Sequence, residues 1–188
     1  MKKIIALAFC FLFLFTACSD ENGKKAEINE DSYASYVGAG EMTLINILVN
    51  SNAKFVNEIF IANHLDIDET KTVKNPEGEF APVVSDEYKT LADLKSHLEA
   101  TYTKDAVEEI LSDKKYVDIE GKLHFNTEYA ESDYYKLDWS QPEVSAAIDA
   151  EENYIISITV KNEKGRDSLI KAVAVSENGS LKLSKLYY

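Results

Sequence analysis

An acidic stretch with a nearby histidine is the first part of the sequence whose residue types could do chemistry. Asp66 and Asp68 are separated by one residue in the segment DIDET, and His64 lies two residues before them. This spacing matches the DxDxT pattern of phosphatases with an aspartyl nucleophile, and the three side chains together could ligate a metal ion. Phosphatase chemistry needs the first aspartate at the end of a buried strand, beside a bound Mg²⁺. Here a helical pattern precedes the motif and a polar loop follows it, so we expect a solvated loop and no metal.

The other two histidines, His97 and His124, lie in separate elements without a neighbouring set of ligands. His97 falls on a predicted helix beside Leu98, and His124 falls on a predicted strand beside Phe125. The chain contains no GxSxG elbow, phosphate-binding loop, CxxC pair or HExxH motif. The sequence therefore predicts a protein that is not an enzyme and that uses no cofactor.

Cys18 offers chemistry of a different kind, because it follows a segment with the layout of a secretory signal. Lys2 and Lys3 precede an apolar run at residues 4–15, after which Thr16 and Ala17 lead to the cysteine. A permanent membrane helix needs roughly 20 apolar residues, which is more than this run contains. The residues FTAC that end at Cys18 resemble the lipobox of bacterial lipoproteins. The resemblance implies that the thiol of Cys18 receives a diacylglyceryl group and that cleavage leaves this cysteine as the first residue.

The same resemblance divides the chain into three segments. These are a lipoprotein signal peptide at residues 1–17, a lipid-anchored flexible tether at 18–31 and a folded domain at 32–188. Cys10 lies in the signal that would be removed, so we expect no disulfide in the mature monomer. Two or more acyl chains anchor a protein stably. We therefore expect an extracytoplasmic protein held through Cys18 on the cell membrane or, in an envelope with two membranes, on the outer membrane.

The charge of the chain limits which partners it can bind. It has 20 Lys and Arg against 33 Asp and Glu, a net charge of −13. Removal of Lys2 and Lys3 with the signal leaves 18 minus 33, or −15, on the mature protein. Nucleic acid and anionic lipid head groups would repel such a surface, whereas a basic protein would be attracted. We expect no binding to nucleic acid.

Apolar residues at steps of three and four predict a helical region over residues 32–65. They include Leu44, Ile45, Leu48, Phe55 and Ile59. A polar patch at residues 50–52 interrupts this pattern. The sequence therefore predicts either one long helix or a pair of helices separated at the patch.

Turn and capping signals divide the next part of the chain. Pro and Gly residues predict a loop over 66–78, and Pro82 favours an edge strand within 80–88. Thr90, with Asp93 three residues later, predicts the start of an amphipathic helix. Thr103 predicts the start of a second, shorter helix.

After residue 115 the hydrophobic period changes from helical to alternating. Residues 116–119 and 122–125 flank Gly121 and predict a hairpin. Further strands are predicted at 135–139, 144–149, 154–161, 168–176 and 181–187. Helices followed by antiparallel strands indicate the α+β class, and we predict N-terminal helices and a curved antiparallel meander in a single domain.

A tyrosine-rich acidic segment separates the hairpin from the later strands. Tyrosine side chains are enriched at protein interfaces, and stacking on a carbohydrate is another use for them. We expect Trp139, in the strand that follows, to lie in the core, and the loop before it to be a contact site. The candidate partner-binding residues are Asn126, Glu128, Tyr129, Glu131, Ser132, Asp133 and Tyr134.

The stretch YKTLADLKSHLEATYTKDAVEEIL, followed by DIEGKLHFN and KLDWSQPEV, resembles the IseA family of secreted inhibitors of cell-wall DL-endopeptidases. The similarity covers residues 88–144. It implies that the protein binds and blocks NlpC-type peptidoglycan hydrolases, whose cysteine nucleophile lies in a cleft, and so restrains autolysis. By position, residues 126–133 would enter that cleft. The family's loop is rich in small residues with a Gly pair, whereas this loop carries Tyr129, Glu131 and Ser132.

A second hypothesis needs no inhibitory loop. Cystatin-like and nuclear-transport-factor-like proteins also combine helices with a curved sheet. A lipoprotein of that kind would bind a small ligand in an apolar pocket between the sheet and the side chains of Ile45, Leu48 and Phe55.

Overall fold

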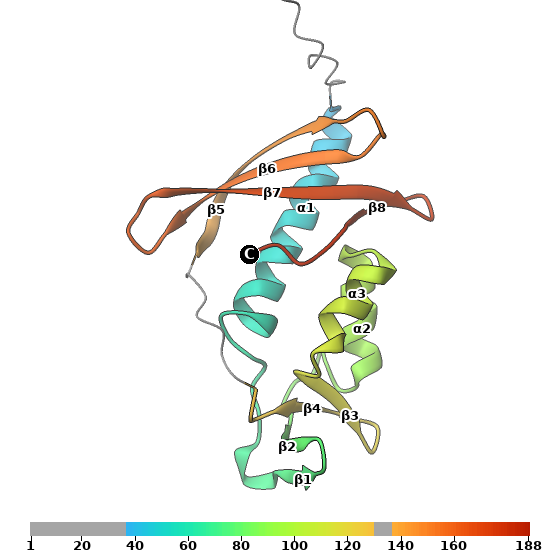
Figure 1. Ribbon diagram of the computed structural model, residues 1–188, viewed down its shortest axis with the longest axis vertical. Coiled ribbons are helices and arrows are strands. Elements are labelled where there is room, and N and C mark those ends of the chain that lie inside the picture. Colours follow the sequence, from blue (N-terminus) through green and yellow to red (C-terminus); the bar gives the residue numbers. More distant parts are fainter. Residues whose placement is uncertain (1–36, 130–136) are drawn as a thin grey trace, which may run out of the picture. The chain divides into compact units, whose positions relative to one another are not determined.

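The computed structural model describes residues 37–129 and 137–188 of the chain (Figure 1). Its first element is α1, Ala39–Lys54, which continues without a break as a π-helical segment, Phe55–Phe60. The Glu41 carboxylate accepts a hydrogen bond from the Gly38 amide at 2.7 Å, which satisfies a free N–H group at the start of the helix. The sequence predicted either one long helix or two helices, and the structure has one.

The polar patch stays helical because Asn52 has buried partners. Its side chain is fully buried, and its amide donates to the Tyr187 carbonyl at 2.8 Å. Its carbonyl oxygen accepts from the Tyr102 hydroxyl and from the Tyr187 N–H, both at 3.0 Å. A buried amide with three partners joins the helix to two distant segments, so it favours the fold and does not interrupt it.

The buried face of α1 differs in one respect from the predicted face. Ile45, Leu48 and Val49 are buried, as expected, but Leu44 is 51% exposed and Ile47 is 55% exposed. Leu44 therefore belongs to the helical pattern but lies outside the buried face of the helix. The helix buries a narrower stripe than its apolar content suggests.

The first sheet has four antiparallel strands in the spatial order β1, β2, β4, β3. They are β1 (Val73–Asn75), β2 (Gly78–Pro82), β3 (Tyr116–Ile119) and β4 (Lys122–Asn126). The loop predicted over 66–78 was partly wrong, because it contains β1 and a short 3₁₀ turn, Glu69–Lys71. The predicted edge strand was also misplaced: β2 lies between β1 and β4, and Pro82 is its last residue. A proline at that end interrupts no long ladder of hydrogen bonds.

Two short helices connect the parts of this sheet. Helix α2, Leu91–Thr101, begins after Thr90, whose hydroxyl accepts from the Asp93 N–H at 3.1 Å. Asp93 in turn accepts from the Thr90 N–H at 2.9 Å. Helix α3, Lys104–Ser112, begins after Thr103. Both helices and both caps were predicted from the sequence, and the structure confirms them.

The second sheet is a strongly curled antiparallel meander in chain order (Figure 1). Its strands are β5 (Leu137–Ile148), β6 (Tyr154–Asn162), β7 (Asp167–Glu177) and β8 (Ser180–Leu183). The strands predicted at 135–139 and 144–149 meet in the single strand β5, and residues 135–136 lie outside the described residues. Its pairing with β6 shifts register between Asp138 and Glu143, so a bulge at residues 139–142 accommodates Pro142.

Helix α1 lies against this curled sheet and contacts its two outer strands, β5 and β8. Buried Ile156 and Ile158 from β6 and Ala172 from β7 join the side chains of α1 in one hydrophobic core. The Tyr154 hydroxyl on β6 donates to Glu41 near the start of the helix at 2.5 Å. The α+β class predicted from the sequence is therefore confirmed, with the strands divided between two four-stranded sheets. Among the helices that the structure describes, none is both long enough and apolar enough to cross a membrane.

Candidate functional site

The predicted partner-binding segment is described only at its start. Asn126 ends β4, and Glu128 and Tyr129 follow it. Glu131, Ser132, Asp133 and Tyr134 lie outside the described residues, as does Cys18.

The described start of the segment is fixed to the hairpin by a tight turn. The Asn126 N–H donates to the Lys115 carbonyl at 2.9 Å, across the end of the β3–β4 pair. The Asn126 side chain accepts from the Glu128 N–H at 3.0 Å, and the Asn126 carbonyl accepts from the Tyr129 N–H at 3.1 Å. These bonds hold Tyr129 in one place relative to the sheet.

Tyr129 is a half-buried phenol with a carboxylate partner. Its hydroxyl donates to Asp113 Oδ2 at 2.6 Å, and its ring centroid lies 5.2 Å from Lys115 Nζ. Burial, followed by the hydrogen bond to Asp113, raises the pKa of Tyr129 to about 12. The side chain is therefore a protonated donor at neutral pH, with its ring beside a cation.

Lys115 connects this tyrosine to the end of the long helix. Only 5% of Lys115 is exposed, and its ammonium donates to the carbonyls of Phe60 at 2.6 Å and Asn63 at 3.0 Å. A cation at the C-terminal carbonyls of a helix interacts favourably with the helix dipole. The ammonium thus satisfies the carbonyl of Phe60, the last residue of the π-helical segment, and that of Asn63 beyond it.

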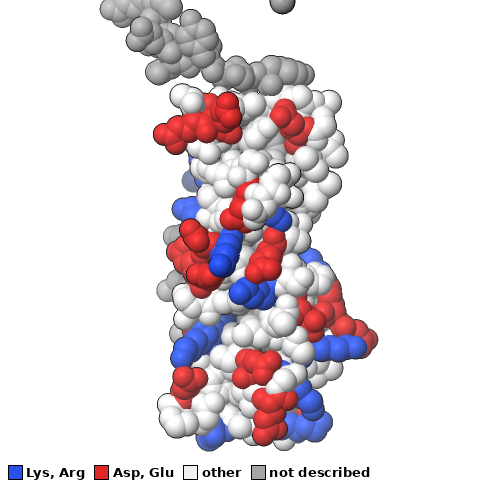
Figure 2. All heavy atoms as spheres, turned by 90° about the vertical axis from the view of Figure 1, so that its right-hand side faces the viewer, with Lys and Arg blue, Asp and Glu red and all other residues white. Residues whose placement is uncertain are grey.

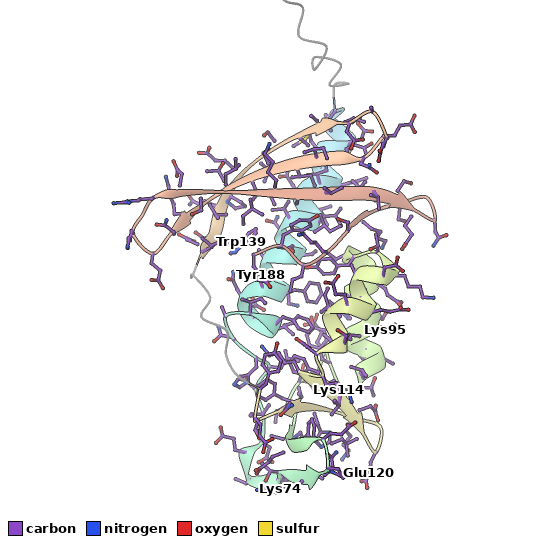
Figure 3. All side chains as sticks on the ribbon, viewed as in Figure 1. Lys74, Lys95, Lys114, Glu120, Trp139 and Tyr188 are labelled. Carbon is purple, nitrogen blue, oxygen red and sulfur yellow. The ribbon has the colours of Figure 1, made fainter. Side chains whose placement is uncertain are left out.

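Tyr129 borders an open groove of about 560 Å³, here called the Tyr129 groove. Its walls come from the end of the π-helical segment, from α3 and from the C-terminal residues. Tyr188, labelled in Figure 3, ends the chain there and is 59% exposed. The charges in the walls are mixed. The lining comprises Phe60, Ile61, Ala106, Glu109, Ile110, Ser112, Asp113, Lys115, Tyr129, Lys185, Leu186, Tyr187 and Tyr188.

Sequence reasoning found Tyr129 but missed Asp113, Lys115 and Tyr188. For Asp113 and Lys115 a signal was present, because the hairpin pairs Tyr116 with Phe125. Extending that antiparallel register places residues 113–115 opposite those that follow Phe125. Nothing in the local pattern places Tyr188 there, since its position depends on the path of the chain after β8.

His64, Asp66 and Asp68 form no metal-binding cluster. The His64 ring is stacked on Phe125 at 4.3 Å, and Nδ1 lies 2.8 Å from the Leu65 carbonyl. Asp68 accepts from the Thr70 hydroxyl at 2.5 Å and pairs with Lys71 at 2.6 Å, and these partners lower the pKa of Asp68 to about 2. Asp68 thus stabilises its own turn, while Asp66 is exposed. Among the described residues, no group of His, Cys, Asp and Glu is arranged to hold a metal ion.

The two remaining histidines have local roles. His97 lies on α2, with Nδ1 3.4 Å from Glu87 and its ring edge-on to Tyr88. His124 is buried in β4, and its Nδ1 lies 3.0 Å from the Lys122 carbonyl. Neither faces the Tyr129 groove.

The surface charge is intermixed. Figure 2 shows acidic and basic side chains interspersed over the face it presents, without a division into separate acidic and basic regions. On this face, the acidic side chains are not gathered at one local site.

The three side chains that the second hypothesis places around a pocket are buried. Ile45, Leu48 and Phe55 are each less than a tenth exposed and belong to the hydrophobic core.

Comparison of the sequence with protein-family models and with curated proteins found no match.

Proposed function

We propose that the protein is a lipid-anchored, extracytoplasmic inhibitor that binds the catalytic domain of a cell-wall DL-endopeptidase of the NlpC type. The observation that carries this proposal is the rigid start of the acidic tyrosine segment beside the open Tyr129 groove. A contact segment that leaves a fixed hairpin loses less conformational freedom on binding than a free loop.

The groove has the composition of a protein-binding surface. Tyr129 and Tyr188 offer aromatic area, and the partly buried Ile61, Ile110 and Leu186 lie beside them. Tyrosines in desolvated pockets are frequent energetic centres of interfaces. The similarity of residues 88–144 to the IseA family supports an endopeptidase as the partner.

The net charge supports the same kind of partner. A mature charge of −15 attracts a basic catalytic domain over a distance comparable to the Debye length, about 8 Å at physiological salt. Such attraction raises the association rate more than it lowers the dissociation rate. Inhibition should therefore weaken as salt is added.

The test is peptidoglycan hydrolysis by purified NlpC-type endopeptidases of the same cell, with and without the mature chain carrying Cys18→Ser. We expect inhibition, and we expect Tyr129→Ala to raise the inhibition constant by about 30-fold or more, as for a central interface residue. The double variant Glu131→Ala with Asp133→Ala should also weaken inhibition.

A matched control removes the same charge elsewhere. Glu151 and Glu152 are exposed in the turn between β5 and β6, so replacing both by Ala lowers the acidic charge equally. The Glu151 and Glu152 double variant should still inhibit, whereas the Glu131 and Asp133 double variant should inhibit less. If the mature chain neither inhibits nor binds any of these enzymes, the proposal is wrong.

A further inference from the structure

A second groove lies beside Trp139 and shares no lining residue with the Tyr129 groove. It has a volume of about 570 Å³ and runs between the C-terminal half of the long helix and the start of β5. Figure 3 labels Trp139 at this end of β5. We call it the Trp139 groove, and the polar side chains that line it include Asn50, Asn57, Asn63, Asp138 and Ser140.

Trp139 carries a hydrogen-bond donor without an acceptor. The residue is 5% exposed, and among the described residues its indole nitrogen is the one buried side-chain polar atom that lacks a partner. Buried donors are nearly always paired, because an unpaired donor loses its bonds to water and gains nothing in return. An acceptor supplied by a ligand in the groove would remove this cost.

The backbone around Trp139 is also irregular. Residues 139–142 of β5 lie opposite Val160 alone, since the register shifts between Asp138 and Glu143. Bulges redirect side chains and are over-represented next to functional sites. Here the bulge places Trp139 in the wall of a groove, where the regular strand pattern predicts only a core residue.

The polar walls fit a ligand that both donates and accepts hydrogen bonds. Asn50 is exposed on α1, and each asparagine amide can donate and accept. The Asp138 carboxylate accepts from the Ser140 N–H at 2.9 Å, and its pKa is lowered mainly by bonds to Ser140. It is therefore ionised at neutral pH, with acceptor capacity left for a ligand hydroxyl.

The charges of the groove disfavour an anionic ligand. Its cation, Lys54, is already paired with Glu87 at 3.0 Å and lies over the Tyr88 ring. Glu58 and Asp138 add two negative charges to the lining. Phosphates and free carboxylates would be repelled, whereas neutral hydroxyl and amide groups would not.

We propose that the Trp139 groove binds a neutral oligosaccharide built of N-acetylated hexosamines. The sugar hydroxyls pair with Asn50, Asn57 and Asp138, and an acetamido carbonyl accepts the indole N–H after a small shift of the buried ring. The volume lies within the roughly 300–1,000 Å³ typical of small-ligand sites. This inference does not depend on endopeptidase inhibition, because it uses a different groove.

Trp139 is the only tryptophan in the chain, so its fluorescence reports directly on the groove. The experiment titrates the mature chain carrying Cys18→Ser with the trimer of β-1,4-linked N-acetylglucosamine. We expect a saturable change in emission. Replacing Asn50 and Asn57 together by Ala should weaken binding about tenfold or more, because two side-chain hydrogen bonds are lost.

Two further variants separate binding from folding. Asn46→Ala removes an exposed amide from the same helix one turn before Asn50 and should leave binding unchanged. Trp139→Phe keeps an aromatic ring but removes the N–H, and calorimetry should show binding about three- to tenfold weaker. The Asn50 and Asn57 variant should inhibit an endopeptidase as the parent chain does, which separates this proposal from the previous one.

Three results would overturn the inference. They are the absence of saturable binding, unchanged affinity in the Asn50 and Asn57 double variant, and equal binding of a short uncharged peptide in place of the sugar. The last would assign the groove to peptides.

Discussion

Asn52 is the residue at which a polar signal in the sequence has its largest structural effect. Its three buried hydrogen bonds join α1 to Tyr102 at the end of α2 and to Tyr187 near the C-terminus. Such a network is stabilising only while every member is paired. The same amide that suggested a helix break from the sequence therefore holds three segments together.

Replacing Asn52 by Ala should lower the free energy of unfolding by about 3 kcal/mol, because the Tyr102 hydroxyl and the Tyr187 backbone lose buried partners. Urea denaturation of the two proteins measures the difference. Asn46→Ala is the control: it removes an exposed amide from the same helix and should change stability by less than about 0.5 kcal/mol. Equal effects of the two variants would contradict this role for Asn52.

Tyr129 predicts that the free energy of unfolding depends on pH in the alkaline range. Its pKa in the folded protein is about 12, against an ordinary value of 10.0, so the folded state resists loss of the proton. The stabilisation is complete below the unfolded pKa and is lost as the pH rises from about 10 towards 12. Nuclear magnetic resonance of labelled tyrosine rings, assigned by comparison with Tyr129→Phe, should show this late titration.

Asp113→Asn tests the cause of that shift. Burial is the larger cause and remains in the variant, so the pKa of Tyr129 should fall but stay above its ordinary value. An unchanged pKa of Tyr129 in the Asp113→Asn variant would show that the bond to Asp113 does not contribute to the shift.

At the level of whole elements, the two capped helices differ in a measurable way. Thr90 and Asp93 form a reciprocal pair, with each side chain accepting from the other's backbone N–H. Thr103 accepts from the Ala106 N–H at 3.4 Å, and an alanine at that position has no carboxylate to return the bond.

We therefore expect Thr90→Ala to lower the free energy of unfolding by about 1 kcal/mol or slightly more, and Thr103→Ala to lower it by less. Thermal and urea unfolding of both variants provide the comparison. A larger loss for Thr103→Ala would show that the geometry of the second cap is better in solution than its long bond indicates.

The elements that could be predicted from the sequence are those set by local signals. Helices α2 and α3 follow from Thr90 and Thr103, and the β3–β4 hairpin follows from alternation around Gly121. The parts that could not be predicted depend on distant partners. β1 is an exposed three-residue strand that pairs with β2, and β5 contains Pro142 because a bulge accommodates it.

The two grooves show the same limit. Tyr129 was singled out from the composition of its segment, and the burial of Trp139 was correctly predicted from the strand pattern. The unpaired indole N–H was not predictable, because it results from which side chains surround the ring. Whether a buried polar group finds a hydrogen-bond partner depends on the packed structure, and the periodic pattern of a sequence does not reveal it.

At the scale of the whole molecule, the expected charge and the proposed lipid attachment would act together. The mature chain would carry −15, and the lipid on Cys18 would hold it at a surface where its partners are concentrated. An anchored binding protein meets its target at a high effective concentration, so modest affinity at each groove suffices. The removal of the signal peptide and the attachment of the lipid are both expected to occur at Cys18.

Cys18→Ser should abolish incorporation of labelled palmitate and release the protein from the membrane fraction, because serine lacks the thiol that accepts the lipid. Cys10→Ser is the matched control, since it makes the same change within the apolar run and should leave both properties intact. The contrast separates lipidation from mere export, which both variants should retain.

Two acyl chains resist extraction by salt, whereas an electrostatic attachment does not. Retention of the Cys18 variant on salt-washed membranes would therefore contradict anchoring through this residue.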